Sequence, residues 1–235
     1  MSDEPTIPPP IPAATVILVR DAPHPEAAGT TRLEVLMLHR TSTVAFGGMW
    51  VFPGGRVEDG DRRPGEVGDD GVEAAGRRAA VREAAEECGL VVDPDGIVPF
   101  ARWTPPAAAV KRFATWFFLA RVPTGEVVVD GGEILDHRWL APSEVLAARD
   151  RGEVDLAPPT WMTLSELLPS TDVRTALTRA ASRPLVHYET HWRGVDGGAV
   201  AMWAGDAGYE TSDPSVPGAR HRLWMLEDGW RSEIS

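Results

Sequence analysis

The chain has 235 residues, a formal net charge of −12 and a sequence pI of about 4.9. This acidity argues against general binding to nucleic acid or to anionic membrane surfaces, because both would repel it. A hydrophobic content of 43% is enough for a core, and the length fits one large domain or one domain with an appendage. No leader-like start and no apolar run of about 18 residues is present, so we expect a cytoplasmic protein. The single cysteine, Cys88, excludes an intrachain disulfide and is expected in the core.

The first elements predicted are a loose arm and a β-hairpin. Residues 1–12 are rich in proline, which is typical of an unpacked terminus. Apolar runs at 15–19 and 33–38 predict two paired strands, and 50–52 predict a short third strand. This strand enters the turn Phe52-Pro53-Gly54-Gly55, whose glycines are expected to adopt backbone angles that other residues resist.

A long helix follows an exposed loop at residues 59–71. Asp70 with Glu73 three residues later predicts a capped helix start. The helix is predicted to run to Cys88, where Gly89 has the position of a C-cap glycine.

Three carboxylates gather on one side of this helix. At about 100° per residue, Glu83, Glu86 and Glu87 fall within an arc of roughly 100°, and Ala84 and Ala85 fall on the opposite, apolar side. Like charges at these spacings cost about 0.2–0.5 kcal/mol per pair, which favours a bound cation. All-oxygen ligands suit Mg²⁺ or Mn²⁺. The alternative interpretation is an ordinary solvated helix surface.

The second half of the chain predicts further strands, short helices and a change of character. The predicted strands cover residues 91–92, 97–100, 113–122 and 137–140. The predicted helices follow Ser143, Thr160 and Asp172 and end near Ala148, Leu168 and Ala181. Residues 183–235 contain three strand-like runs, at 186–190, 199–204 and 223–226, between Gly- and Pro-rich turns. We therefore predict a main domain at 13–182 and a β-rich C-terminal extension at 183–235 that packs on it and is a candidate homodimer surface.

The segment Arg82-Glu83-Ala84-Ala85-Glu86-Glu87-Cys88-Gly89-Leu90 resembles the second half of the Nudix box. In that pattern Arg-Glu-apolar-x-Glu-Glu-x-Gly-apolar follows a glycine, five residues, a glutamate and seven residues, and Gly55 matches the glycine. Asp61 stands where the family usually has glutamate, and the gap at 62–81 has twenty residues. An alignment through Gly68 keeps the spacing but places Ala74 at the glutamate and leaves the glycine turn unexplained.

The resemblance covers roughly residues 12–170 and implies an α/β (α+β) fold, the Nudix α/β/α sandwich with a mixed β-sheet. The lengthened gap, residues 102–106, 111–118 and 158–160 also resemble the larger coenzyme A diphosphatase-like branch. Ala45 and Ala114 depart from that branch.

The resemblance implies a metal site. Glu83, Glu86 and Glu87 would ligate one to three divalent ions, Mg²⁺ or Mn²⁺, together with the Gly55 carbonyl. Such ions polarise a diphosphate and lower the pKa of an attacking water. The remote acid is expected to be Glu133, whose alternative is an ordinary loop residue. The general base stays open among Glu86, Glu87 and Glu133.

The resemblance also implies supporting and substrate-binding residues. Arg82 would orient the helix carboxylates, or only pair with Glu86, and Asp61 would support Arg82. The candidates for phosphate contact are Gly54, Arg40, Lys111 and Arg112, and those for stacking are Trp103, Phe46 and Trp50. The alternative for each of these side chains is packing or solvation.

These expectations combine into a metal-dependent pyrophosphohydrolase that cleaves a nucleoside diphosphate linked to another moiety, with no nucleic acid or membrane partner. Coenzyme A or an acyl-coenzyme A ranks first, and ADP-ribose, nucleotide sugars and dinucleotides are alternatives. A non-catalytic sensor of a nucleotide metabolite is the alternative of another class.

Overall fold

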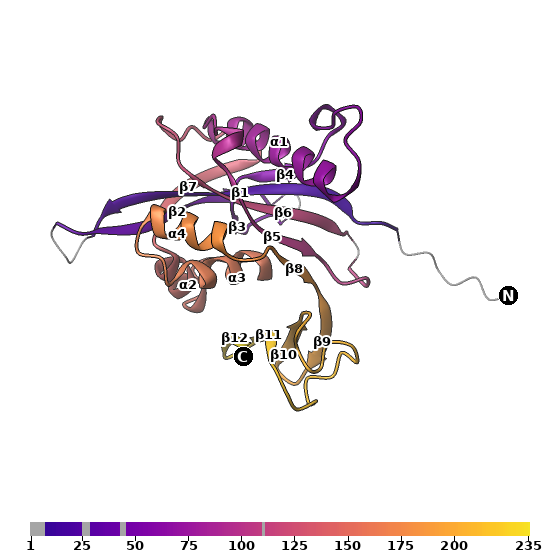
Figure 1. The fold of residues 1–235 in the computed structure, drawn as a ribbon. Coiled ribbons are helices and arrows are strands. Elements are labelled where there is room, and N and C mark those ends of the chain that lie inside the picture. Colours follow the sequence, from indigo (N-terminus) through magenta and orange to yellow (C-terminus); the bar gives the residue numbers. More distant parts are fainter. Residues whose placement is uncertain (1–7, 25–28, 43–45, 110) are drawn as a thin grey trace.

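The computed structural model describes residues 8–24, 29–42, 46–109 and 111–235. The main sheet has eight strands in the order β3-β2-β1-β6-β5-β8, with β4 added to β1 and β7 added to β2 (Figure 1). Its strands are β1 Ile11–Pro23, β2 Thr31–Arg40, β3 Trp50–Val51, β4 Gly54–Arg56, β5 Val98–Thr104, β6 Phe113–Arg121, β7 Ile134–Leu140 and β8 Val186–Glu189. The sheet is mixed, because β1/β6 and β5/β8 are parallel and the other pairs antiparallel.

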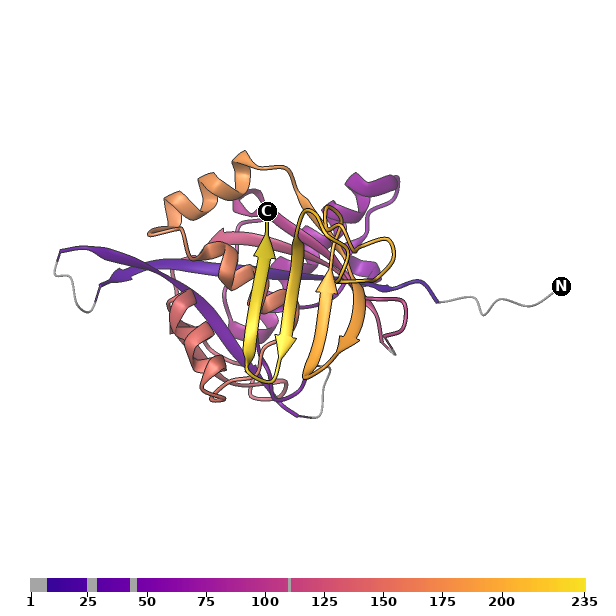
Figure 2. The same ribbon diagram turned by 90° about the horizontal axis from the view of Figure 1, so that it is seen from below.

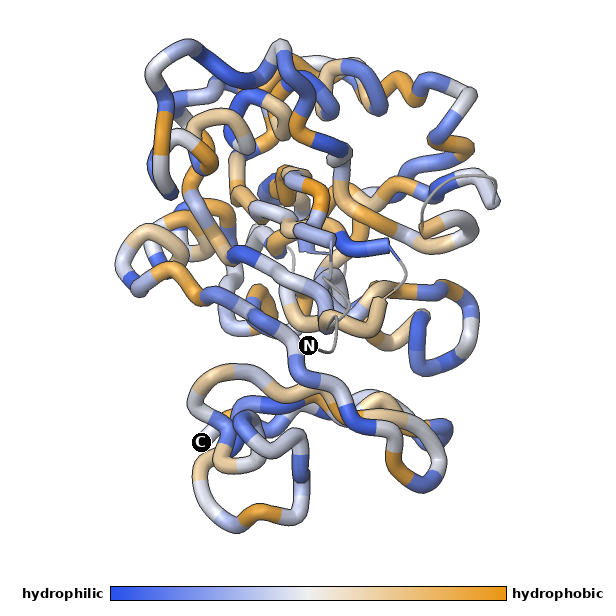
Figure 3. The backbone as a smooth tube through the Cα atoms, turned by 90° about the vertical axis from the view of Figure 1, so that its right-hand side faces the viewer, coloured by the Kyte–Doolittle hydropathy of each residue, from blue (hydrophilic) through white to orange (hydrophobic). Residues whose placement is uncertain are grey.

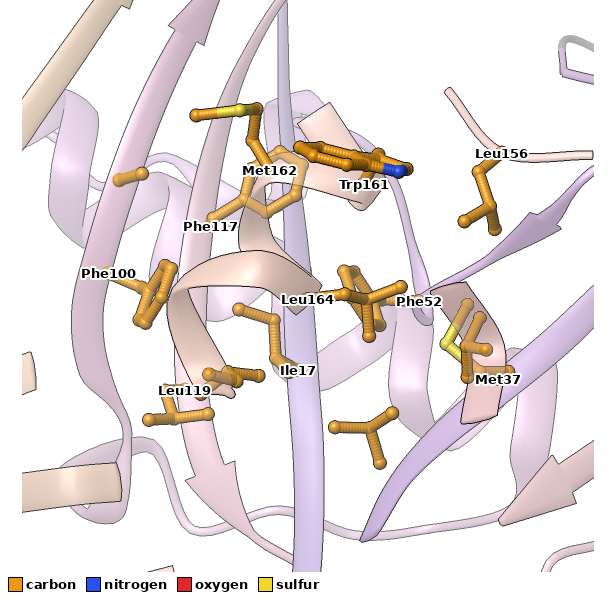
Figure 4. Close-up of a cluster of buried hydrophobic side chains, with 14 of the residues drawn as sticks. Ile17, Met37, Phe52, Phe100, Phe117, Leu119, Leu156, Trp161, Met162 and Leu164 are labelled. Carbon is orange, nitrogen blue, oxygen red and sulfur yellow. The ribbon is translucent and has the colours of Figure 1, made fainter. Parts of the chain in front are cut away.

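Helices cover both faces of this sheet, so the predicted α/β/α sandwich is confirmed (Figure 1). Helix α1 (Gly68–Cys88) packs on one face, where alternate residues of β1 such as Val16 and Leu18 meet Ala80 and Ala84. Helices α2 (Pro142–Asp150), α3 (Pro158–Leu167) and α4 (Val173–Ser182) cover the other face. Figure 4 shows Trp161, Met162 and Leu164 of α3 packed among Phe52, Phe117 and other side chains of the sheet.

Strands β3 and β4 set the position of the glycine turn. Strand β3 pairs with β2 through Leu38 and Val51, whereas β4 pairs with β1 through Thr15 and Gly54. The turn at Phe52 and Pro53 therefore crosses from one strand of the hairpin to the other. The Pro53 carbonyl accepts the Val16 amide at 2.9 Å and the Thr15 hydroxyl at 2.5 Å, so the turn is tied to β1 beneath α1.

Helix α1 begins earlier than predicted. Its first residue is Gly68 and its N-cap, Val67, makes no side-chain cap, so the prediction of a capped start at Asp70 was wrong. Asp69 and Asp70 lie in the first turn instead, where negative charge is favoured by the helix dipole. The C-cap prediction is confirmed, because Gly89 has a left-handed φ of 71° and its amide reaches the Ala84 and Ala85 carbonyls.

Several other boundaries also differ. Residues 91–92 form no strand, and the short 3₁₀ helix η2 (Pro94–Gly96) follows them; a second one, η1 (Asp59–Asp61), interrupts the predicted loop. Helix α2 starts at Pro142 with Ala141 as N-cap, so Ser143 is not the cap, because proline at the first helical position needs no amide partner. Strand β1 takes in the last residues of the predicted arm, and residues 1–7 lie outside the described part. Among the helices described, none is long and apolar enough to cross a membrane.

The C-terminal segment forms a second sheet of four antiparallel strands in the order β12-β11-β10-β9. They are β9 His191–Val195, β10 Gly198–Met202, β11 His221–Leu226 and β12 Gly229–Ile234. Strands β9 and β12 were not predicted, and β8, which was predicted within the extension, joins the main sheet. The sheet lies across the α2–α4 side of the sandwich (Figure 2) and is a distinct layer in Figure 3.

A buried ion pair holds the long loop between β10 and β11. Arg222 donates to Asp206 from Nε at 2.7 Å and from Nη2 at 2.6 Å, and both side chains are almost fully buried. Asp206 also accepts the amides of His221 and Gly208 at 2.9 and 2.8 Å. Although burial opposes its charge, these donors lower the pKa of Asp206 to about 2.

This shift predicts acid sensitivity of the fold. A carboxylate whose folded pKa lies below its unfolded value of 3.8 stabilises the fold above that value, and the contribution is lost as pH falls towards 2. We expect the difference in unfolding free energy between the wild type and Asp206→Asn to shrink by about 2 kcal/mol between pH 5 and pH 2. Urea unfolding across this range measures it. A difference independent of pH would contradict the assignment.

Candidate active site

The glycine turn packs directly against the acidic helix. The Gly54 amide donates to Glu87 Oε2 at 2.8 Å. A Cβ on Gly54 would lie 2.5 Å from the Ala14 carbonyl oxygen, and one on Gly55 would lie 2.2 Å from Glu83 Oε1. Neither glycine has a positive φ, so the prediction of unusual backbone angles was wrong. A side chain at Gly54 would therefore meet the backbone of β1, whereas one at Gly55 would displace the end of Glu83.

Glu87 faces the sheet and not the solvent. It is only 4% exposed, whereas Ala85 is exposed, so the predicted division into an acidic and an apolar side is wrong at these positions. The turn at Gly54 leaves room for a carboxylate on the side of α1 that packs. Burial raises the pKa of Glu87 to about 7, against the opposing effects of Arg40 and the Gly54 amide.

Arg82 connects three of the predicted acids. Its guanidinium lies 3.0 Å from Asp61 Oδ2, 3.0 Å from Glu83 Oε1 and 2.8 Å from Glu86 Oε2, and it donates to the Arg56 carbonyl at 2.9 Å. Asp61 is buried and also accepts the Glu58 amide. Burial lowers the pKa of Arg82, but Asp61 and Glu83 outweigh it and raise the pKa. The structure thus brings Arg82, Asp61, Glu83 and Glu86 together.

Arg40 joins the helix to Glu133. Its Nη2 lies 2.5 Å from Glu133 Oε2 and 3.4 Å from Glu87 Oε1, and its Nη1 donates to the Gly54 carbonyl at 3.2 Å. The Glu133 side chain is 55% exposed and is held in place by its loop, because its own amide donates to Asp130. The remote acid predicted from the sequence therefore lies beside the helix acids, with an arginine between them.

The donor set fits a hard divalent cation. Glu87 Oε1 is buried without a hydrogen bond, and its ion-pair distance of 3.4 Å to Arg40 is long. Burial also raises the pKa of Glu83, so both carboxylates would be stabilised as anions by added positive charge. Within the described residues no group of three or more acidic, His or Cys side chains is already spaced to hold an ion. In the structure Arg40 lies beside Glu87 and Arg82 beside Glu83, so each carboxylate already has a positive charge close to it.

A cavity of about 750 Å³ opens from this site. Of the residues proposed from sequence for substrate or catalysis, those that line it are Arg40, Gly54, Gly55, Glu83, Trp103, Lys111, Glu133 and Phe46. Glu87, Glu86 and Arg82 are not in the lining: Glu87 accepts the Gly54 amide, and the more exposed Glu86 pairs with Arg82. Arg112 is not in the lining, since its guanidinium donates to the Pro8 and Pro105 carbonyls. Trp50 is buried and stacks on His39.

The sequence pointed to none of several further lining residues. Arg56 and Glu58 follow the glycine turn directly, and that position was the available signal. Thr190, Trp192, Ala201, Trp203 and Met225 come from the C-terminal segment. Their contribution depends on long-range packing and leaves no local pattern.

Cys88 is a core residue, as predicted. It is fully buried, and its thiol donates to the Ala84 carbonyl at 3.0 Å. Burial raises the pKa of Cys88 to about 11, so it is no thiolate nucleophile near neutral pH.

The close contact at Gly55 predicts a loss of activity with little loss of stability. In Gly55→Ala the new methyl meets the flexible end of Glu83, which can turn away but then leaves its position beside Arg82. We expect hydrolysis to fall at least about tenfold and the unfolding free energy to change by less than about 1 kcal/mol. Gly60→Ala is the matched control, since a Cβ there meets nothing within 4 Å. Equal activities of the two variants would contradict the prediction.

Comparison with known proteins agrees with this geometry. A family model described as the NUDIX domain matches residues 10–160. The chain is 28% identical over 193 residues to Putative nudix hydrolase 7 of Caenorhabditis elegans; the match covers 66% of this chain and 59% of that relative. The solved structure of a NUDIX hydrolase from Alicyclobacillus acidocaldarius is 23% identical with a TM-score of 0.62, and the match covers 75% of this chain and 99% of that one.

The glycine turn lies against the acidic helix, and the cavity of about 750 Å³ opens beside both. The chain belongs to the NUDIX domain family. Enzymes of this family cleave nucleoside diphosphate derivatives and generally use divalent metal ions. The predicted family and fold are thereby confirmed, and the roles of single residues stay predictions.

Proposed function

We propose that the protein is a divalent-metal-dependent diphosphatase that cleaves a nucleoside diphosphate linked to another moiety, with coenzyme A or an acyl-coenzyme A as the first candidate. The observation that carries the proposal is the cavity. Its wall combines charged side chains, such as Glu83, Glu133 and Arg40, with apolar ones, such as Phe117 and Trp203. A diphosphate with a polar and an apolar end matches such a wall, and the volume lies within the range of small-molecule sites.

Three cationic side chains support binding of the diphosphate. Arg40, Arg56 and Lys111 all line the cavity near the acidic end. The Arg56 guanidinium and the Lys111 ammonium lie 5.8 and 5.6 Å from the ring centre of Phe113, so both are gathered on one side of the mouth. Charge-assisted hydrogen bonds from such groups are strong for phosphate oxygens.

The metal would be held by Glu83, Glu86 and Glu87 with the Gly55 carbonyl. When bound, a divalent ion such as Mg²⁺ or Mn²⁺ polarises the diphosphate and lowers the pKa of a bound water. Arg82 keeps Glu83 and Glu86 oriented towards the site through its contacts at 3.0 and 2.8 Å. In this proposal Glu133, which lines the cavity, would accept a proton from the attacking water once Arg40 turned towards phosphate; Glu86 and Glu87 are the alternative bases.

The other candidate substrates differ in the group beyond the diphosphate. ADP-ribose, nucleotide sugars and dinucleotides end in polar sugars or a second base, for which the apolar half of the cavity offers few hydrogen bonds. A non-catalytic sensor would need no buried carboxylate such as Glu87, whose burial raises its pKa and is costly to retain.

A substrate panel with Mg²⁺ or Mn²⁺ tests the proposal. It compares coenzyme A, acyl-coenzyme A, ADP-ribose, NADH, nucleotide sugars and dinucleoside polyphosphates by phosphatase-coupled phosphate release. We expect coenzyme A derivatives to give the highest kcat/KM. A higher kcat/KM for a sugar-linked diphosphate would overturn the substrate assignment. No phosphate release from any compound of the panel would contradict the proposed diphosphatase activity.

A further inference from the structure

The C-terminal sheet forms one wall of the catalytic cavity. The same 750 Å³ space is lined by Glu83 and Glu133 and by residues of β9, β10 and β11. These segments are about 60–140 positions apart in the chain, and the fold brings them together because the sheet lies across the sandwich (Figure 2). A wall shared with the acids makes this sheet part of the substrate site.

The strand register explains why one face of the sheet is apolar. Ala201 pairs with Trp192 of β9 and with Leu223 of β11, and Ala199 pairs with Met225. Since side chains alternate along a strand, these five residues point to one face, towards the core of the sandwich. The opposite face carries Arg193 and Arg222. The cavity therefore meets the apolar face.

Most aromatic residues of this wall are fixed by neighbours. Trp103 stacks on Tyr188 with ring centres 3.9 Å apart and meets Trp203 edge-on at 5.5 Å. The Trp203 indole also donates to the Thr190 hydroxyl at 3.0 Å. All three rings are at most 4% exposed, so they shape the wall and are unable to turn towards a ligand.

Trp192 differs from them. It lines the cavity but is 52% exposed, and within the described part of the chain it has no ring contact and no side-chain hydrogen bond. Its strand partner is the small Ala201, which lines the same cavity, so no bulky side chain of β10 stands directly opposite the indole. A large apolar side chain at the rim of a cavity gains most from covering a ligand, because only then is its surface removed from water.

We propose that the β9–β12 sheet, through Trp192, binds an apolar group attached to the diphosphate and makes Trp192 a specificity-determining residue. The proposal rests on the proposed function for the reaction, but it concerns the end of the substrate away from the cleaved bond. It commits to an acyl chain as the group that lies against the indole, because the inward face of the sheet offers methyl, thioether and ring surface. Diphosphates with that chain are then preferred over the same diphosphates without it.

The test compares decanoyl-coenzyme A with coenzyme A, which carry the same nucleotide and diphosphate. We expect Trp192→Ala to lower the ratio of their kcat/KM values about tenfold. Trp192→Phe should retain most of the preference. Trp224→Ala is the matched control, since Trp224 lies on the outer face of β11, opposite Val200, and should leave the ratio unchanged.

An unchanged ratio in Trp192→Ala would overturn the proposal, and so would an equal loss in Trp224→Ala, which would indicate damage to the sheet. Calorimetric binding of the two compounds to metal-free protein separates this proposal from the reaction. Tighter binding of decanoyl-coenzyme A that is lost in Trp192→Ala supports acyl-chain binding by the sheet even if nothing is cleaved. Equal binding of both compounds to the wild type overturns acyl-chain binding by the sheet even if hydrolysis occurs.

Discussion

Glu87→Gln is expected to reduce metal-dependent hydrolysis by at least about 10³-fold, because removing a metal-binding carboxylate removes several kcal/mol of transition-state stabilisation. The neutral amide can still accept the Gly54 amide hydrogen, so the glycine turn should stay in place. Only the charge of the buried carboxylate is removed. Steady-state kinetics with saturating Mg²⁺ measures the loss, and calorimetric titration with Mn²⁺ measures the lost metal affinity.

The matched control for this variant is Glu73→Gln. Glu73 lies on the same helix, more than three turns before Glu87, and pairs with Arg77 at 3.0 Å. We expect its activity to stay within about twofold of the wild type, since the pair is partly exposed and lies away from the cavity lining. Full activity in Glu87→Gln, or an equal loss in both variants, would refute the assignment of Glu87 to the site.

Asp206→Ala is expected to cost about 3–5 kcal/mol of folding free energy, because Arg222 would be left as a buried charge without its partner. The amides of His221 and Gly208 would lose their acceptor as well. If the C-terminal sheet forms the cavity wall, the variant should also lose activity at temperatures where the wild type is fully active. Urea unfolding gives the first quantity and thermal inactivation the second.

Glu153→Ala is the control for the loss of an ion pair as such. Glu153 pairs with Arg151 at 2.7 Å, but both side chains are more than half exposed, so we expect a change below about 1 kcal/mol. A similarly small effect of Asp206→Ala would show that the buried pair does not hold the sheet.

The sequence was most informative where chemistry and local geometry coincide. Three acids and a terminal glycine within one helix predicted both the Gly89 C-cap, which is confirmed, and the position of the acidic site. The burial of Glu87 could not be predicted, because it depends on Gly54 and Gly55, which come from a distant turn and leave room for the carboxylate. Helical spacing alone shows which residues share one side of the helix, but not which segment of the chain packs against that side.

The C-terminal sheet was predicted in part for a related reason. Strands β10 and β11 are apolar and were recognised. Strands β9 and β12 each combine one tryptophan, Trp192 or Trp230, with polar and charged residues, so neither contains an apolar run. The Asp-Gly pairs at Asp196 and Asp228 were the available hairpin signals. That this sheet faces the acids across a cavity follows from packing over long sequence distances, which no local pattern records.

The most direct test of the account is the identity of the products after reaction in ¹⁸O-labelled water. Metal-stripped protein with coenzyme A and added Mg²⁺ should give two products that each keep one phosphate of the diphosphate, with ¹⁸O in only one of them. The reaction should require the ion and should be absent in Glu87→Gln. Release of phosphate from any other position, or cleavage that persists in Glu87→Gln, would contradict a diphosphatase built on the acidic helix and the glycine turn.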